Sequence, residues 1–168
     1  GQVAEQFPGH LWRIFGPEYA SEPYLPPHLF EAYVVQYVDP MVKMIQAHGG
    51  FVRLHSHGRL RNILSHIHGM GVDALDPVEP PPHGDMELAE VRQQVGRDIV
   101  LCGNLEVADI EHLPPAQFEK VVLKTLKDGT AGDGRGFIRL PTAATYGRQI
   151  PKQTMLNYET IVRLARNF

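Results

Sequence analysis

The sequence alternates five short apolar runs, each long enough for a strand, with segments in which apolar residues recur at helical spacing. The runs are LWRIF (11–15), FVRLH (51–55), ALDPV (74–78), IVLCG (99–103) and GFIRL (136–140). The middle runs are nearly continuous in valine, isoleucine and leucine, which is typical of parallel strands covered on both faces. Strands that alternate with helices predict an α/β fold with a mostly parallel sheet.

The intervening segments predict helices with recognisable ends. An apolar stripe over 30–38 is followed by Asp39-Pro40, which reads as an N-cap and a first-turn proline and predicts a new helix ending at Gly49-Gly50. Asp85 is predicted to cap the helix MELAEVRQQV. Similar stripes predict helices over 60–67, 118–126 and 158–165.

Composition excludes several classes of protein. The 168 residues fit a single domain, 1–168, and the net charge of −3 without a basic run gives no support for nucleic-acid binding. No apolar stretch approaches the roughly 20 residues of a membrane span, and the start GQVAEQFPGH does not resemble a secretion signal. The single cysteine, Cys102, excludes an intramolecular disulfide and predicts a cytoplasmic protein.

Polar side chains follow the apolar runs, where parallel α/β proteins bind their ligands. They are Glu18, Tyr19, His55, His57, Arg59, Glu79, Cys102, Asn104, Glu106 and, after the last strand, Tyr146. Imidazole and thiolate suit zinc, and a carboxylate can complete a set of three protein ligands. Since alternate residues of a strand face the same way, the two imidazoles are expected to point to one place.

Structural explanations compete with this functional one. A His-X-His pair at a strand end can be satisfied by backbone carbonyls, and a lone Cys102 is more often a small buried hydrophobic residue than a ligand. Glu79, between a strand and three prolines, is costly to bury without a partner, and a salt bridge to Arg59 would suffice.

The stretch HSHGRLRNILSHIHGMGVDALDPVEPPPHGD, followed by IVLCGNLE and GFIRLPTAATYG, resembles the C-terminal half of the uroporphyrinogen decarboxylase family. That family also includes zinc methyltransferases that use a corrinoid. The resemblance implies a (β/α)8 barrel, of which this chain supplies about five of the eight strands. Open strand edges and an apolar inner face then predict a second copy of the chain or an absent N-terminal half as a partner.

The resemblance also implies two enzymatic functions. The His-X-Cys pair that binds zinc in the methyltransferases becomes His55-Ser56-His57 here, and their late cysteine has no counterpart among residues 142–146. We therefore expect His55, His57 and Cys102 as zinc ligands, with Glu79 as the other candidate for the third position. The first function is methyl transfer from a corrinoid, or another methylated donor, to a thiol, with a corrinoid protein as a possible partner.

The second function is decarboxylation of a tetrapyrrole without a metal, and the third possibility is an inactive binding module. For a small-molecule substrate, the predicted catalytic residues are Glu79, Arg59 and Tyr146. The predicted substrate-binding residues are Glu18, Tyr19, Asn104 and Glu106.

Overall fold

The fold is an open, five-stranded parallel sheet, seen in a computed structural model that describes residues 1–132, 136–145, 147 and 149–168. Each strand pairs in parallel with the next along the chain, in the order β1-β2-β3-β4-β5. The strands are β1 (Leu11–Ile14), β2 (Phe51–His55), β3 (Ala74–Val78), β4 (Val100–Leu105) and β5 (Phe137–Pro141). This confirms the predicted α/β fold, and the open sheet is consistent with part of a TIM-type barrel.

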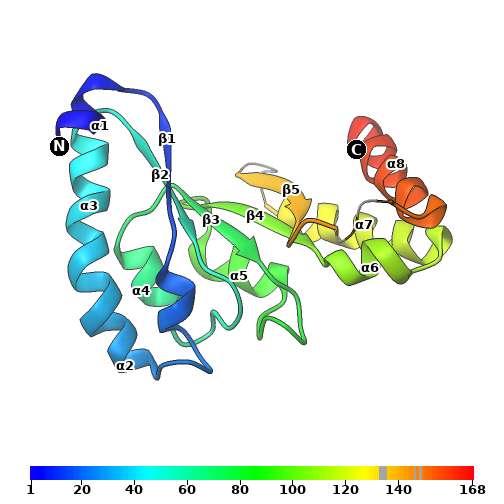
Figure 1. Ribbon diagram of the computed structural model, residues 1–168, viewed down its shortest axis with the longest axis horizontal. Coiled ribbons are helices and arrows are strands. Elements are labelled where there is room, and N and C mark those ends of the chain that lie inside the picture. Colours follow the sequence, from blue (N-terminus) through cyan, green and yellow to red (C-terminus); the bar gives the residue numbers. More distant parts are fainter. Residues whose placement is uncertain (133–135, 146, 148) are drawn as a thin grey trace.

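Helices follow the strands, as the sequence pattern predicts (Figure 1). They are α1 (Gln2–Gln6), η1 (Pro17–Ala20), α2 (Pro27–Phe30), η2 (Glu31–Val35), α3 (Gln36–Ala47), α4 (Leu64–Gly69), α5 (Leu88–Val95), α6 (Val107–His112), α7 (Pro115–Gly129) and α8 (Lys152–Asn167). In the described part of the chain, no helix combines the length and the apolar character needed to cross a membrane.

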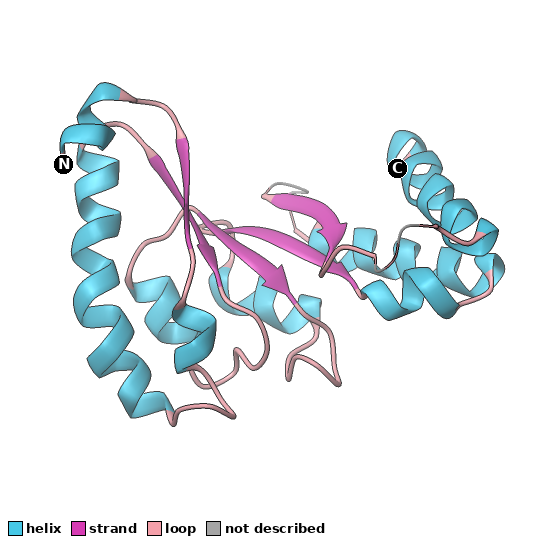
Figure 2. Ribbon diagram, viewed as in Figure 1, coloured by secondary structure: helices cyan, strands magenta, loops and turns pink. Residues whose placement is uncertain are grey.

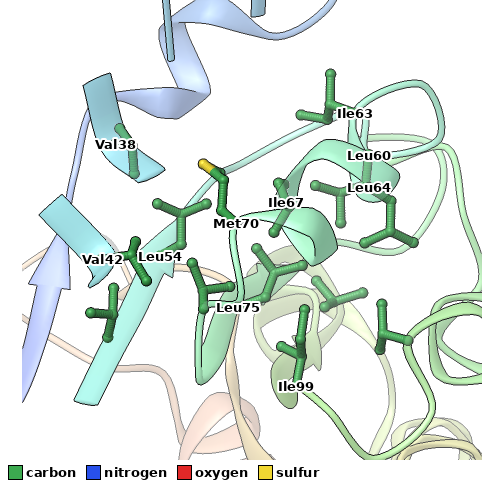
Figure 3. Close-up of a cluster of buried hydrophobic side chains, with 14 of the residues drawn as sticks. Val38, Val42, Leu54, Leu60, Ile63, Leu64, Ile67, Met70, Leu75 and Ile99 are labelled. Carbon is green, nitrogen blue, oxygen red and sulfur yellow. The ribbon is translucent and has the colours of Figure 1, made fainter. Parts of the chain in front are cut away.

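The main hydrophobic core lies between the sheet and helices α3, α4 and α5. Val52 and Leu54 of β2 point into it and are fully buried, together with Leu75 of β3 and Leu101 of β4. Figure 3 shows Leu54 and Leu75 facing residues of α3 and α4 such as Val42 and Ile67. A smaller cluster joins the end of β4 to α6, α7 and α8, which lie together at the C-terminal end in Figure 2.

The opposite face of the sheet is open, unlike the two-sided burial that the apolar runs predict. Leu11 of β1 and Phe51 of β2 are register partners, and each exposes about half of its surface (54% and 51%). On β5, Ile138 is also exposed. In a β-strand successive side chains alternate between faces, so the residues that flank the core positions of β1 and β2 form this open face.

Two predicted helix starts are wrong. Asp39-Pro40 does not begin a helix: Pro40 lies inside α3, and Asp39 forms an ion pair with Lys43 one turn later. The helical segment is continuous from α2 through the wider π turn η2, which precedes the proline. Likewise, Glu87 caps α5 in a capping box with Glu90.

Asp85, the predicted cap of α5, instead binds backbone N–H groups after β2. Its Oδ1 atom accepts hydrogen bonds from the N–H groups of Leu60, at 2.8 Å, and Arg61, at 3.1 Å. This carboxylate therefore ties the loop after β3 to the loop after β2.

Candidate active site at the carboxyl ends of the strands

A pocket of about 640 Å³ opens where β2 and β3 end, against η1 and the turn that follows it. Figure 1 shows the loops after β2 and β3 at the same edge of the sheet as the short helix after β1. Six residues predicted for the site line this pocket, namely Glu18, Tyr19, His55, His57, Arg59 and Glu79. These six predicted residues therefore lie together at one edge of the sheet.

His55 ends β2 on the open face of the sheet, opposite Asp76 of β3 in the strand register. Its Nδ1 atom lies 2.6 Å from Oδ1 of Asp76 and 2.7 Å from Nη2 of Arg13. A proton on Nδ1 is donated to the carboxylate and leaves a lone pair on Nε2. In the other tautomer, Nδ1 accepts a hydrogen bond from Arg13 and Nε2 carries the proton.

Asp76 is the centre of a charged network that the sequence reasoning missed. It is 1% exposed and accepts hydrogen bonds from Arg13, at 2.7 Å, from Arg53 Nε and from His55. Burial alone would raise the pKa of Asp76, but the bonds from His55 and Arg13 and the charge of Arg53 outweigh it, so the pKa lies below its usual value. The signal for this role was an aspartate within the apolar run ALDPV, because a buried carboxylate needs partners.

His57 and Glu79 form a second histidine–carboxylate pair across the ends of β2 and β3. Nδ1 of His57 lies 2.9 Å from Oε1 of Glu79, and Oε2 of Glu79 accepts the backbone N–H of Gly58 at 2.6 Å. Gly58 has φ of 83°, a conformation that side chains disfavour. The predicted salt bridge from Glu79 to Arg59 is thus replaced by bonds to His57 and to the backbone.

The two groups of this pair shift each other's pKa in opposite directions. The hydrogen bond to Glu79 raises the pKa of His57 despite partial burial. Burial would raise the pKa of Glu79, but the bonds from His57 and the Gly58 N–H lower it overall. Both shifts favour the charged pair.

The imidazoles of His55 and His57 lie side by side, with ring centroids 4.6 Å apart and planes at 82°. The prediction that they point to one place is therefore confirmed. In the part of the chain that the structure describes, the hydrogen bonds of both rings use Nδ1. Neither Nε2 atom takes part in these bonds.

Cys102 does not join the two histidines. It lies within β4 and not at its end, is fully buried, and burial raises the pKa of its thiol to about 11. Within the described ranges, no three His, Cys, Asp or Glu side chains are placed to hold a metal ion. The predicted ligand set of His55, His57 and Cys102 is therefore incomplete in this chain, although the two histidines alone fit a pair of ligands.

Asn104 and Glu106, both predicted to bind substrate, do not line this pocket. Asn104 is buried on the helix side of β4, where its Oδ1 accepts from Thr125 of α7 at 3.2 Å. Glu106 lies 3.2 Å from Nδ1 of His83, and His83 does line the pocket. Tyr146, the third predicted catalytic residue, falls outside the described residues.

Comparison with known proteins agrees with this architecture. The family model described as uroporphyrinogen decarboxylase (URO-D) matches residues 12–156. A solved structure of a methyltransferase from Methanosarcina mazei is similar with a TM-score of 0.71 at 17% sequence identity, over 95% of this chain and 42% of that one.

That likeness establishes the fold, and this chain spans less than half of the length of its structural relative. No curated protein matches the sequence. The family match covers most of the chain, from β1 into α8. The chain belongs to the uroporphyrinogen decarboxylase family.

Proposed function

We propose that this chain carries the metal-binding and substrate-binding part of an enzyme that transfers a methyl group to a thiol. One observation supports this above the others: two adjacent imidazoles line a pocket, and each is held at Nδ1 by a carboxylate. Histidines that bind metals almost always donate their second ring N–H to a carboxylate, a backbone carbonyl or water, which fixes the tautomer and the ring orientation. Asp76 and Glu79 are placed for that role.

His55 and His57 would hold zinc through their Nε2 atoms. Zinc bound there would keep a thiol substrate in its thiolate form, which is the nucleophile in methyl transfer. Catalytic zinc sites use three protein ligands and leave one position open, so a residue beyond the described cluster has to complete the site. The methyl group would come from a corrinoid, delivered by a corrinoid protein, or from another methylated donor.

This chain's residues would prepare the site for that chemistry. The carboxylate of Asp76 would keep the proton of His55 on Nδ1, and it is paired with Arg13 and Arg53. Glu79 orients His57 and is itself fixed by the Gly58 N–H. Both carboxylates are largely buried, so water does not compete strongly for these bonds.

Metal-free decarboxylation of a tetrapyrrole is the alternative, and Arg59 in the pocket wall is the feature that favours it. Two other arginines, Arg13 and Arg53, are less available to a substrate, because both form ion pairs with Asp76. Arg139 donates to the backbone carbonyl of Ile161 in α8. A substrate with many carboxylates would therefore meet few available cations, so the geometry favours methyl transfer.

The experiment that separates these functions is a pair of assays on one preparation of the protein. Methylation of a thiol by methylcobalamin is measured with added zinc, after treatment with a chelator, and after zinc is restored. Decarboxylation of uroporphyrinogen is measured in parallel. We expect thiol methylation that is lost with the chelator and recovered with zinc. Metal-independent decarboxylation, or neither activity, would refute the proposal.

A further inference from the structure

A third imidazole lines the same pocket as His55 and His57. His83 lies on the loop between β3 and α5, and 59% of its side chain is exposed. Its Nδ1 atom lies 3.2 Å from Oε2 of Glu106, the residue that precedes α6. The Glu106 side chain is only 12% exposed, and within the described residues this oxygen makes no hydrogen bond to any other group. His83 and Glu106 thus form a third histidine–carboxylate pair beside the pocket.

The loop that carries His83 folds back onto Glu79, the partner of His57. The N–H of Gly84 donates to the carbonyl of Pro80 at 3.0 Å, and a Cβ atom at Gly84 would overlap the carbonyl oxygen of Glu79. Such a close approach of two backbone segments requires glycine. Burial would raise the pKa of Glu79, whereas its hydrogen bonds and the charge of His83 lower it. The turn therefore keeps His83 close to the pair of Glu79 and His57.

The other side chains of the wall that could bind a metal already have partners. Glu79 uses both of its oxygens in the hydrogen bonds described above. Glu18 accepts the backbone N–H of Gly16 at 2.8 Å, and Glu22 accepts a side-chain amide at 2.6 Å. In the contacts among the described residues, His83 uses Nδ1 and not Nε2. It is therefore the best placed donor of the wall after the first two histidines.

We infer that His83 is the third protein ligand of the zinc site, beside His55 and His57. The inference rests on the zinc site of the proposed function but not on methyl transfer. Three histidines with one open position are an established ligand set for catalytic zinc. In each of the three pairs a carboxylate lies next to Nδ1, which is the arrangement that leaves Nε2 to bind a metal.

His83 has to move toward the other two histidines when the metal binds. Among the described residues, no three His, Cys, Asp or Glu side chains surround one point in the structure. The His83 ring is more than half exposed and has a single ion pair, so it can turn about its side-chain bonds. Exposed side chains change rotamer within nanoseconds. Zinc binding is therefore expected to fix the orientation of this ring.

The ligands of the bound metal can be counted directly. X-ray absorption at the zinc edge of the purified, zinc-loaded protein identifies imidazole ligands by scattering from the carbon atoms of their rings. We expect three imidazoles in the wild type and two in His83→Ala. Because His83 is an exposed loop residue, the variant should keep its fold, which circular dichroism checks. Two imidazoles in both proteins would overturn the inference.

Zinc affinity, measured by competition with a chromophoric chelator, gives a second readout. His83→Ala should weaken zinc binding by about a hundredfold, the upper end of what supporting residues of metal sites contribute. Glu18→Gln is the control within the pocket wall, and His68→Ala is the control outside it. Both should keep the affinity within about fivefold of the wild type. Zinc loss in Glu18→Gln but not in His83→Ala would mean that the third ligand is a carboxylate and that the inference is wrong.

The same samples separate this inference from the proposed function. Three imidazoles in a protein that does not methylate a thiol would leave the ligand set and refute the proposed activity alone. Zinc-dependent methylation with two imidazoles in both proteins would refute the inference alone. A wild-type protein that binds no zinc would refute both.

Discussion

Nδ1 of His57 lies 2.9 Å from Oε1 of Glu79, which joins the end of β2 to the end of β3 at the edge of the pocket. Glu79 is only slightly exposed, and its second oxygen is occupied by the N–H of Gly58. The pair therefore has one fixed geometry, in which the imidazole presents Nε2 away from the carboxylate. Because both groups titrate, its strength depends on pH.

In the metal-free protein, the coupling between His57 and Glu79 should be strongest in mildly acidic solution. The pKa of His57 is raised above 6.5, so its contribution to stability is complete below 6.5 and is lost as pH rises through the folded value. The pKa of Glu79 is lowered below 4.5, so its contribution is present above 4.5 and is lost as pH falls through the folded value. The charged pair contributes most between these two limits.

A double-mutant cycle of His57→Ala and Glu79→Gln, followed by urea unfolding, measures this coupling. Because His57 is partly exposed, we expect about 1 kcal/mol near pH 5.5 and less near pH 8.5. The cycle of His68→Ala and Asp98→Asn is the control, since this more exposed pair outside the pocket has a similar 2.9 Å contact. A coupling energy that grows with pH would contradict the assignment.

Replacing Asp76 by asparagine should destabilise the protein. The substitution keeps the shape of the side chain but leaves Arg13 and Arg53 without their counter-charge and weakens the bond to His55. Removing one partner of a buried ion pair costs roughly 3 kcal/mol in the free energy of unfolding. Urea unfolding at neutral pH measures the loss.

Asp98→Asn is the matched control for this substitution. Asp98 forms its ion pair with His68 at the surface, where such pairs contribute about 0–1 kcal/mol. Equal stabilities of the two variants would mean that Asp76 does not hold the two arginines together.

The open face of the sheet predicts association with another copy of the chain or with further chain of the same enzyme. Leu11 and Phe51 lie beside each other on this face, and within the described sheet the edge strands β1 and β5 each have a neighbour on one side only. Phe51→Asp should shift the protein toward smaller species in sedimentation velocity, because it places a charge in the contact. Tyr37→Asp on the exposed side of α3 should have no such effect. A wild-type protein that is a compact monomer at all concentrations would refute the prediction.

The sequence predicts the sheet well because each strand can be recognised from its own short run of residues. FVRLH and IVLCG are recognisable as strands from their own residues, and the helices between the strands favour parallel pairing, although β2 is buried on one face only. Helix starts were less predictable. Asp39 and Asp85 are both residue types that favour N-cap positions. Asp39 instead lies inside α3 and pairs with Lys43 one turn later, and Asp85 accepts the N–H of Leu60 from a distant loop.

The sequence indicates which strand ends form the candidate site, but it does not reveal the hydrogen-bond partners of the residues there. The histidines and Glu79 follow directly from strand ends, whereas Asp76 became visible only once the register placed it beside His55. Cys102 was misplaced because the run IVLCG does not reveal where β4 ends; the strand continues to Leu105. The sequence shows how far apart two residues lie along one strand, but it does not show the distance between side chains on different strands.

The most direct test of the account is the zinc content of the purified protein and of two single variants. Mass spectrometry of metals after dialysis should find about one zinc per chain in the wild type and in His68→Ala, and little in His57→Ala. His68 is a suitable control because its ring also binds a carboxylate, away from the pocket. Zinc absent from the wild type, or retained at the same level by His57→Ala, would contradict the claim that His55 and His57 form a metal site.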